Sequence, residues 1–342
     1  NSSKNKNIAY ILIYDYVLFF YLKTIVRLKM DNILSLINYF PLQIRDKILK
    51  YRDKFNMLEE IRIKANVNII LKIGQADIIV DYITNQDELL QILQTICDNS
   101  IYSYQSQICN GYITLKGGHR VGITGSTVIE DGKVKNITYI YSLNFRVAKE
   151  IIGCSESIIK DILKLEENTI YNTIIVSPPG RGKTTLLRDI VRQISNGIPK
   201  LGFKGINVGV VDERDEISAM YKGIPQNEIG IRTDVLSNIP KAIGMKMLIR
   251  SMNPKVIVAD EIGTEDDAKA INYAVCSGVK GIFTAHGESI EDILVNPILS
   301  KLYSLNVFEL LLFIDENRNI KKHICKRKEK GESSNTYNMY AV

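Results

Sequence analysis

Short apolar runs alternate with amphipathic stretches throughout the second half of the chain. The runs lie near residue 175 and at 205–211, 256–259 and 281–285, and apolar residues at helical spacing mark the segments between them. Short runs that are almost wholly apolar are typical of strands buried on both faces, as in a parallel sheet covered by helices. We therefore expect residues 151–330 to form an α/β domain around a mostly parallel sheet. Its further elements are expected to be helices at 240–252, 265–276 and 289–305 and a closing hairpin at 308–314 and 319–325.

The first half has a different pattern, with helical spacing first and strict alternation afterwards. Residues 32–51 have apolar side chains at helical spacing with a break at Pro41, and residues 85–99 form an amphipathic stretch capped by Asn85. Alternation of apolar and polar residues, which is typical of half-buried strands, marks the runs 60–64, 67–73, 77–82, 112–115, 119–124, 137–141 and 144–148. This pattern predicts a smaller α+β domain over residues 30–150.

The two ends of the chain fall outside these patterns. Residues 8–22 are apolar and aromatic except for Asp15, yet this run is shorter than the roughly twenty residues that span a bilayer. Met30 and the residues after it resemble a natural protein start. Residues 1–29 are therefore expected either to be upstream sequence outside the folded protein or to associate with a membrane. Residues 331–342 are expected to form a flexible tail.

Composition places the chain among ordinary globular proteins. Its 342 residues are enough for two domains, and 24% charged with 45% hydrophobic residues is a usual balance. Much of the net charge of +6 lies near the two ends, which argues for a basic tail that contacts an acidic surface and against a DNA-binding groove. The five cysteines form no C-x-x-C pair, so neither a disulfide framework nor a zinc site is expected, and a reducing cytosol fits best.

The chemistry of the chain centres on residues 171–188, which read YNTIIVSPPGRGKTTLLR. A strand, a glycine-rich loop and a helix opening on Lys-Thr follow one another, which is the context of a phosphate-binding loop. Backbone N–H groups would surround an anion, Lys183 would face the β- and γ-phosphates of ATP, and the Thr184 hydroxyl would bind Mg²⁺. Ser177 stands where the G-x-x-x-x-G-K-[ST] pattern has its first glycine. The residues expected to bind ATP are Ser177, Pro178, Pro179, Gly180, Arg181, Gly182, Lys183, Thr184 and Thr185.

Polar clusters follow three of the apolar runs. Asp260 and Glu261 follow four apolar residues, where a phosphate-loop ATPase has a Mg²⁺-holding aspartate and a glutamate that orients or deprotonates water. Glu213 is a candidate to position water or Mg²⁺, and His286 to sense the γ-phosphate. Ligands bind at the carboxyl ends of parallel strands, so these side chains are expected beside the phosphate loop. The alternatives are a helix cap for the acidic pair, an ion pair with Arg214 for Glu213, and a bond to local backbone for His286.

Residues 248–293 resemble the core of the type II and type IV secretion ATPases, with an arginine-bearing helix, the second nucleotide motif and a strand ending in histidine. Those ATPases have glycine before the catalytic glutamate and Arg-Asp soon after it, whereas Asp260 precedes Glu261 here and Gly263-Thr264 follows. From about Met30 to Lys328 the chain closely resembles the stage III sporulation protein AA family. The other motifs that carry this resemblance are GHRVGITG (118–125), SLNFRVAKEI (142–151), VVDERDEI (210–217) and GIRTDVL (230–236).

This resemblance implies a RecA-like P-loop ATPase core preceded by the smaller α+β domain. It implies a homo-hexameric motor that hydrolyses ATP with Mg²⁺ in the mother-cell cytoplasm, peripherally at the membrane facing the forespore. There it would power a secretion-like channel or assembly complex with other membrane proteins of the stage III sporulation A operon, and no nucleic-acid partner is expected. A RecA-like ATPase driven by nucleic acid is the alternative. A nucleotide-binding scaffold without turnover would lack the catalytic carboxylate, whereas Glu261 is present.

Three arginines in turns flanked by glycine or asparagine are further catalytic candidates, namely Arg120, Arg146 and Arg232. Arginines supplied to phosphates speed phosphoryl transfer by orders of magnitude, and secretion ATPases supply them from the first domain. We therefore predict that Arg120 or Arg146 contacts nucleotide, within its own subunit or across a ring interface. The alternative is that both pair with carboxylates of the first domain.

Overall fold

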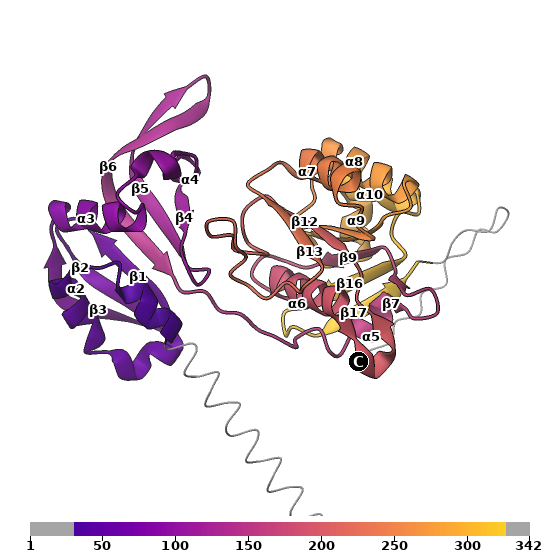
Figure 1. Ribbon diagram of the computed structural model, residues 1–342, viewed down its shortest axis with the longest axis horizontal. Coiled ribbons are helices and arrows are strands. Elements are labelled where there is room, and N and C mark those ends of the chain that lie inside the picture. The colour runs from indigo at the N-terminus through magenta and orange to yellow at the C-terminus, as the bar shows by residue number, and fades with distance from the viewer. Residues whose placement is uncertain (1–30, 326–342) are drawn as a thin grey trace, which may run out of the picture. The chain divides into compact units, whose positions relative to one another are not determined.

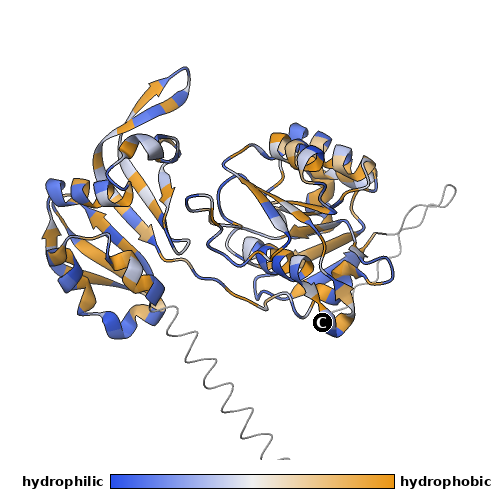
Figure 2. Cartoon of the chain, viewed as in Figure 1, coloured by the Kyte–Doolittle hydropathy of each residue, from blue (hydrophilic) through white to orange (hydrophobic). Residues whose placement is uncertain are grey.

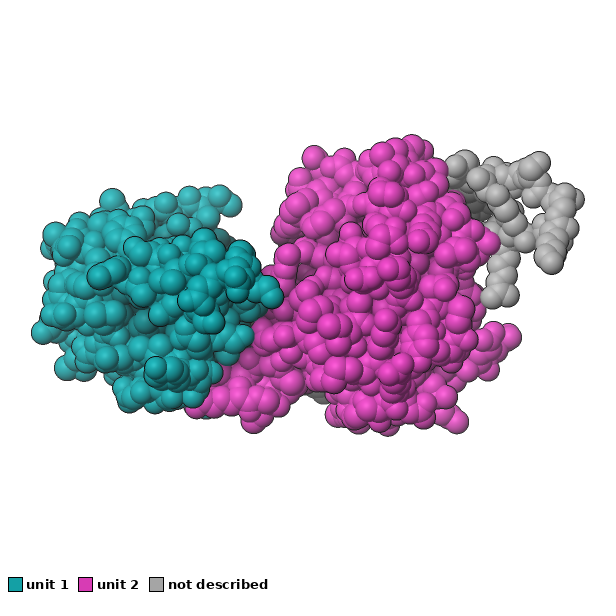
Figure 3. All heavy atoms as spheres, turned by 90° about the horizontal axis from the view of Figure 1, so that it is seen from above, with its two compact units in different colours: residues 1–149 teal, residues 150–342 magenta. Residues whose placement is uncertain are grey.

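The computed structural model describes residues 31–325, which fall into two compact units that divide between Lys149 and Glu150 (Figure 3). Each unit buries an apolar core of its own, as a domain does. The expectations for residues 1–29 and 331–342 lie outside the described residues.

The first unit is built on an antiparallel sheet. Within residues 31–149 this sheet has six strands in the order β3-β2-β1-β6-β5-β4. The strands are β1 (Leu58–Lys64), β2 (Val67–Ile73), β3 (Ala76–Thr84), β4 (Tyr112–Thr114), β5 (Arg120–Glu130) and β6 (Lys133–Arg146). Apolar and polar residues alternate along them, as Figure 2 shows, because successive side chains of a strand point to opposite faces.

Helices pack on one face of this sheet (Figure 1). Residues 31–37 are helical, and the other helices are α2 (Leu42–Leu49), η1 (Arg52–Met57), α3 (Gln86–Ile96), η2 (Ile101–Tyr104) and α4 (Gln105–Cys109). The predicted cap of α3 is confirmed: the Asn85 side chain accepts from the backbone N–H of Glu88, whose carboxylate accepts from the backbone N–H of Asn85. This reciprocal cap fixes where α3 begins, so that Leu89 and Ile92 reach the core.

The strand predicted at 137–141 is confirmed, and that at 144–148 is confirmed as far as Arg146; β6 joins the two segments into one strand. Its pairing with β5 shifts register beside Gly125. Tyr139 has a left-handed φ of 47° there, and a Cβ on Gly125 would lie 2.6 Å from the carbonyl oxygen of Thr138. Such a bulge breaks the alternation by which a strand is recognised in the sequence.

The second unit is built on a mostly parallel sheet, as predicted. Within residues 150–325 this sheet has seven strands in the order β13-β12-β14-β15-β9-β16-β17, and only β16 and β17 pair antiparallel. The strands are β9 (Thr173–Val176), β12 (Val208–Asp212), β13 (Thr233–Ser237), β14 (Val256–Ala259), β15 (Lys280–Ala285), β16 (Leu310–Ile314) and β17 (Ile320–Ile324). The pattern did not predict β13, because all five of its residues are only half-buried and include polar ones.

Helices cover both faces of this second sheet (Figure 1). The described helices and short strands are α5 (Ile159–Ile162), β7 (Leu163–Lys164), β8 (Thr169–Ile170), α6 (Lys183–Asn196), β10 (Gly197–Ile198), η3 (Pro199–Leu201), β11 (Phe203–Lys204), α7 (Lys241–Ser251), α8 (Glu265–Cys276), α9 (Ile290–Val295) and α10 (Pro297–Ser304). Ile175 of β9 joins the core formed with α6, whereas Ile174 and Val176 join the core formed with α7 and α8. Strand β9, which leads into the phosphate loop, is therefore buried on both faces.

Candidate functional site

The loop between β9 and α6 carries the predicted phosphate-binding residues. Gly180 and Gly182 have left-handed φ values of 76° and 97°, which glycine adopts at little cost, and Gly182 precedes the first residue of α6. Ser177 fits where glycine was expected, because its buried hydroxyl donates to the carbonyl oxygen of Pro178 at 2.9 Å. Backbone N–H groups of such a loop and the positive end of the α6 dipole favour an anion.

Lys183, the first residue of α6, is only 6% exposed. Its ammonium nitrogen donates to the carbonyl oxygens of Ser177 at 2.7 Å and Pro178 at 3.1 Å, and it lies 3.4 Å from Nδ1 of His286. Burial lowers the pKa of Lys183, while two nearby carboxylates act in the opposite direction. A phosphate group would give this cation a stronger, charge-assisted partner than two carbonyl groups.

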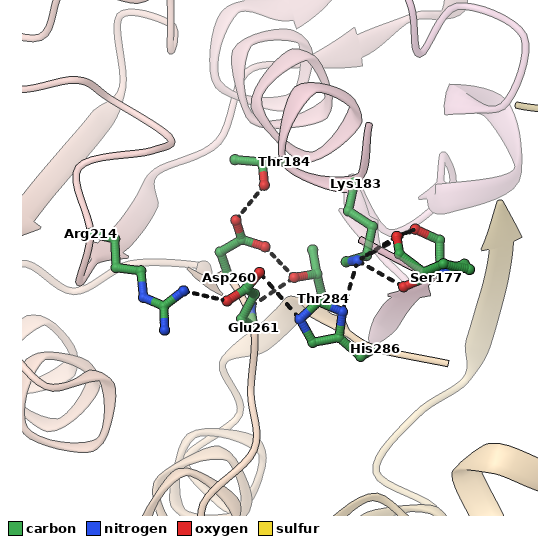
Figure 4. Close-up of polar contacts among 9 residues, drawn as sticks. Ser177, Lys183, Thr184, Arg214, Asp260, Glu261, Thr284 and His286 are labelled. Atoms are coloured by element: carbon green, nitrogen blue, oxygen red, sulfur yellow. Dashed lines mark hydrogen bonds and ion pairs between the residues drawn. The ribbon is translucent and has the colours of Figure 1, made fainter. Parts of the chain in front are cut away.

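A chain of hydrogen bonds joins the phosphate loop to the end of β14 (Figure 4). The Thr184 hydroxyl donates to Oδ2 of Asp260 at 2.6 Å. Oδ1 of Asp260 accepts from the hydroxyl of Thr284, whose oxygen in turn accepts the backbone N–H of Glu261 at 2.7 Å. Burial raises the pKa of Asp260, and the two hydroxyl donors oppose this shift. The two residues predicted to hold Mg²⁺ are thus in direct contact.

Glu261 has partners of its own. One carboxylate oxygen lies 2.8 Å from the guanidinium of Arg214, and the other lies 3.3 Å from Nε2 of His286. Since Nδ1 of His286 faces the ammonium group of Lys183, the hydrogen of this ring is assigned to Nε2, from which it is donated to Glu261. His286 therefore bridges the phosphate-loop lysine and the predicted catalytic glutamate, rather than bonding local backbone (Figure 4).

The alternative prediction of an ion pair between Glu213 and Arg214 is wrong. Glu213 pairs with Lys241 at the start of α7, whereas Arg214 turns to Glu261. Consecutive residues leaving a strand point in different directions, which separates Glu213 from its neighbour. The sequence did not predict that Arg214 pairs with Glu261 or that Lys241 pairs with Glu213. These contacts depend on which elements are neighbours in the fold, and not on spacing along the chain.

These charged side chains line a small pocket of about 20 Å³ at the carboxyl ends of β12 and β14. Its lining residues are Asp212, Glu213, Arg214, Glu216, Lys241, Asp260 and Glu261. Asp212 is 2% exposed and holds the loop after β12, since its carboxylate accepts backbone N–H groups from Glu216 at 2.8 Å and Ser218 at 2.7 Å. Arg188 of α6 donates to the carbonyl oxygen of Glu216 at 2.6 Å. The loop that carries Glu213 and Arg214 is thus tied to the phosphate-loop helix.

A second pocket, of about 250 Å³ and open to solvent, borders the phosphate loop. Its lining residues are Ile151, Cys154, Gly180, Arg181, Gly182, Thr185, Leu186, Ile314, Arg318 and Ile320. Most of its side chains are apolar, in contrast to the carboxylate-lined pocket. Arg181 at its edge donates to the carbonyl oxygen of Glu316 at 3.3 Å and lies 3.6 Å from the Glu316 carboxylate.

The three candidate arginines have different surroundings. Arg120 and Arg146 occupy directly opposite positions on the neighbouring strands β5 and β6 of the first unit. The guanidinium of Arg120 lies 3.9 Å from the centre of the Tyr112 ring. Arg232 donates to the carbonyl oxygen of Ser195 at 2.9 Å, near the C-terminal end of α6. A helix of 14 residues is about 21 Å long, so Arg232 lies far from the phosphate loop of its own chain. Within its own chain Arg232 therefore caps α6, and a catalytic role for it stays a prediction.

Among residues 31–325, no group of three or more His, Cys, Asp or Glu side chains could hold a metal ion by itself. Mg²⁺ prefers oxygen ligands, and it commonly combines one or two carboxylates with waters and substrate phosphates. Thr184 and Asp260 provide such oxygens side by side. The donor set thus fits Mg²⁺ that arrives with a nucleotide.

The fold defines the class of protein: an α/β protein whose mostly parallel sheet follows an N-terminal domain built on an antiparallel sheet. It resembles the X-ray structure of the ATPase DotB from Legionella pneumophila, with a TM-score of 0.53 and 13% identity over 83% of this chain and 81% of DotB. It also resembles the pilus retraction motor PilT with bound ADP, with a TM-score of 0.51 and 14% identity over 82% and 83% of the two chains.

The chain belongs to the family described as sporulation stage III, protein AA, whose family model matches residues 29–333. It is 39% identical over 256 residues to stage III sporulation protein AA of Bacillus subtilis (strain 168), which covers 75% of this chain and 81% of that protein. The family suggested by the sequence motifs is thereby confirmed. No helix in the described part of the chain is both long and apolar enough to cross a membrane.

Proposed function

We propose that this protein binds ATP with Mg²⁺ and hydrolyses it to ADP and phosphate. The observation that carries the proposal is the hydrogen bond of 2.6 Å between Thr184 and Asp260. It joins the first turn of the phosphate-loop helix to the end of β14, which lies two strands away from β9 in the sheet. A glycine-rich turn alone would not need this contact, whereas a Mg²⁺-nucleotide site requires both oxygens at one place.

The phosphate chain would lie in the loop, on its N–H groups and the end of the α6 dipole. Lys183 would exchange its two carbonyl partners for phosphate oxygens. Thr184 and Asp260 would hold Mg²⁺, which when bound neutralises charge on the β- and γ-phosphates. The Thr184 hydroxyl can keep donating to Asp260 while its oxygen faces the metal ion.

Hydrolysis would use the carboxylate-lined pocket. The oxygen of a water molecule attacks the γ-phosphorus, the bond from this phosphorus to the bridging oxygen breaks, and ADP leaves with the electron pair. Glu261 orients the water and takes its proton. Arg214 and His286 hold the two carboxylate oxygens of Glu261, and His286 links it to Lys183 beside the γ-phosphate. Glu213 and its partner Lys241 would position a second water or a Mg²⁺ ligand.

The second pocket would take the base and sugar of the nucleotide. It shares Gly180, Arg181, Gly182 and Thr185 with the loop, and Ile151, Leu186 and Ile320 provide apolar walls for a flat ring. The mostly apolar pocket at the loop and the charged pocket, whose Asp260 contacts Thr184, would thus receive the two ends of a nucleotide.

In its cellular role the protein would be a motor of the secretion-ATPase type that powers a channel or an assembly complex during endospore formation. Membership of the sporulation family and a fold shared with DotB and PilT support this role. The motor would work as a homo-hexamer on the cytoplasmic side of the membrane facing the forespore, with membrane proteins of the same operon as partners. Arg120 or Arg146 would supply a guanidinium to the γ-phosphate.

The test is release of phosphate from Mg²⁺-ATP by the full chain, with anionic lipid vesicles, with single-stranded DNA, and with neither. We expect turnover that depends on Mg²⁺ and that DNA does not raise. No phosphate release under any of these conditions would refute hydrolysis, and stimulation by DNA alone would favour an ATPase driven by nucleic acid.

A further inference from the structure

Thr284 is a polar residue in the middle of the sheet of the second unit. It lies on β15 between β14 and β9, it is 0% exposed, and its neighbours Phe283 and Ala285 are apolar and buried. A hydroxyl buried in such surroundings is destabilising unless it is hydrogen-bonded. Both hydrogen bonds of this hydroxyl go to the consecutive residues Asp260 and Glu261.

The donated hydrogen bond orients Asp260. Thr284 donates to Oδ1, so Oδ2 is left for the Thr184 hydroxyl. A carboxylate held at both oxygens cannot rotate about its last bond, so the face that would meet Mg²⁺ is fixed. Position in the sheet explains the contact: Ala259 pairs with Phe283 in the parallel register of β14 and β15, so the next residues, Asp260 and Thr284, are neighbours.

The accepted hydrogen bond orients Glu261. Its backbone N–H points to the Thr284 hydroxyl at 2.7 Å, and the next N–H, of Ile262, points to the Thr284 carbonyl oxygen at 2.9 Å. Glu261 has a left-handed φ of 51°, a conformation that is unfavourable for a residue with a side chain. These two contacts hold the strained backbone and thereby direct the Glu261 side chain toward Arg214 and His286.

We propose that Thr284 is the residue that positions both carboxylates for hydrolysis, one for the metal ion and one for the water. The proposal rests on the proposed ATPase function. Thr284 itself touches neither nucleotide nor water in this scheme; it acts only through Asp260 and Glu261.

The experiment compares Thr284→Val, Thr284→Ser and Thr173→Val in the full chain. Valine keeps the shape of threonine and loses the hydroxyl, whereas serine keeps the hydroxyl. Thr173 is a matched control, because it is also 0% exposed, lies on the neighbouring strand β9, and donates to a carbonyl oxygen away from both pockets. The measurements are Mg²⁺-ATP affinity by calorimetry, kcat for phosphate release, and hydrogen–deuterium exchange of the peptide that contains Glu261.

For Thr284→Val we expect kcat to fall about ten- to a hundredfold, as for loss of a hydrogen bond to a charged group. ATP affinity at saturating Mg²⁺ should change less than threefold, the Mg²⁺ concentration needed for half-maximal binding should rise, and the Glu261 amide should exchange faster. Thr284→Ser should restore all of these properties, and Thr173→Val should leave them at parental values. Exchange is measured without nucleotide, so it reports on the positioning even if the parent does not hydrolyse ATP.

Parental kcat and parental exchange in Thr284→Val would overturn the positioning role. Equal losses in Thr284→Val and Thr173→Val, or failure of serine to restore them, would also overturn it, because they would indicate general destabilisation. A parent without turnover would refute the proposed function instead, and faster Glu261 exchange in the valine variant alone would then still support the positioning.

Discussion

Arg120 and Arg146 lie directly opposite each other on the antiparallel strands β5 and β6, and Glu60 of β1 lies opposite Arg146 on its other side. Side chains at directly opposed positions share one face of a sheet, with Cβ atoms about 5 Å apart. Like charges in this arrangement repel and are destabilising. Glu60 brings one carboxylate to this face, and we propose that a nucleotide phosphate is a further anion that these guanidinium groups meet.

Arg120→Lys and Arg146→Lys should therefore each reduce turnover far more than they weaken ATP binding. Lysine keeps the charge but loses the planar, two-pronged donor that matches phosphate oxygens. We expect kcat to fall by about tenfold or more, whereas the ATP dissociation constant should change little. Arg62→Lys is the control, since Arg62 lies on β1 of the same unit and pairs with Glu60 at 2.6 Å. Parental kcat in both variants, at concentrations where any ring is assembled, would contradict the prediction.

Lys183→Ala should abolish tight binding of ATP. The buried ammonium group is the cation nearest to the place of the phosphates, and its loss should weaken binding by about a hundredfold. Lys269→Ala is a matched control, because Lys269 is exposed on α8 and pairs with Asp266 at 3.0 Å. The affinity for ATP is measured by calorimetry. Equal affinities for Lys183→Ala and the parent would refute the phosphate-loop assignment.

Glu261→Gln should bind ATP as the parent does and lose most of its turnover. Glutamine keeps the shape of the side chain but cannot take a proton from water, and general bases contribute about 10²–10⁴-fold to rate. Glu265→Gln provides the comparison, since Glu265 lies on the surface and pairs with Lys301 at 3.0 Å. Should Glu261→Gln hydrolyse ATP at the parental rate, the water-activating residue would be another one, with Glu213 as the next candidate.

Some contacts of the candidate site could be predicted from the sequence, and the contact between Thr184 and Asp260 is one of them. Thr184 and Asp260 were assigned to one Mg²⁺ site from two separate patterns, and their hydrogen bond places them together. Each pattern has its own local signal: glycines before a helix for Thr184, and an apolar run before acidic residues for Asp260. Each of these signals lies within a few consecutive residues, so it can be recognised in the sequence before the fold is known.

Residues whose role depends on strand order carried no such signal. Thr284 contacts Asp260 because β14 and β15 are neighbours with a particular register. Lys241 meets Glu213 because α7 begins beside the end of β12, and neighbouring charges along the chain suggested Arg214 instead. The bulge at Gly125 breaks the period of two on which strand prediction depends, so the extension of β5 and β6 beyond it was not predicted.

His119 gives a prediction for pH and stability that is independent of the nucleotide site. This residue of the first unit is 0% exposed. Its Nδ1 accepts the backbone N–H of Ala148 at 3.1 Å, so its Nε2 carries the hydrogen that it donates to Oδ1 of Asn32 at 3.1 Å. Burial lowers the pKa of His119 from 6.5 to about 4. A second proton would have to go on Nδ1, where it would break the bond from Ala148 and place a charge in the core.

Stability should therefore fall as the pH falls from about 6.5 to about 4. In this window the unfolded chain binds a proton at His119 and the folded chain does not, so unfolding is favoured more strongly at each lower pH. Above pH 6.5 both forms are neutral and His119 has no effect. At 1.36 kcal/mol per unit, the free energy of unfolding should decrease by about 2 kcal/mol between pH 7 and pH 5. Carboxylates with lowered pKa, such as Glu59, act only below their ordinary value of 4.5.

The measurement is urea unfolding of the full chain at pH 7, 6 and 5, with His119→Gln and His323→Gln as variants. His119→Gln should be less stable than the parent at pH 7, because glutamine cannot reproduce both hydrogen bonds, but its stability should change much less with pH. His323, whose pKa is also lowered by burial, lies on β17 of the second unit, so its variant should keep the pH dependence of the first unit. If the first unit of the parent and of His119→Gln lost stability equally between pH 7 and pH 5, the neutral, buried state of His119 would not be the cause. Stability of the parent that increases over the same range would contradict the assignment outright, since the sign of the effect follows from the direction of the pKa shift.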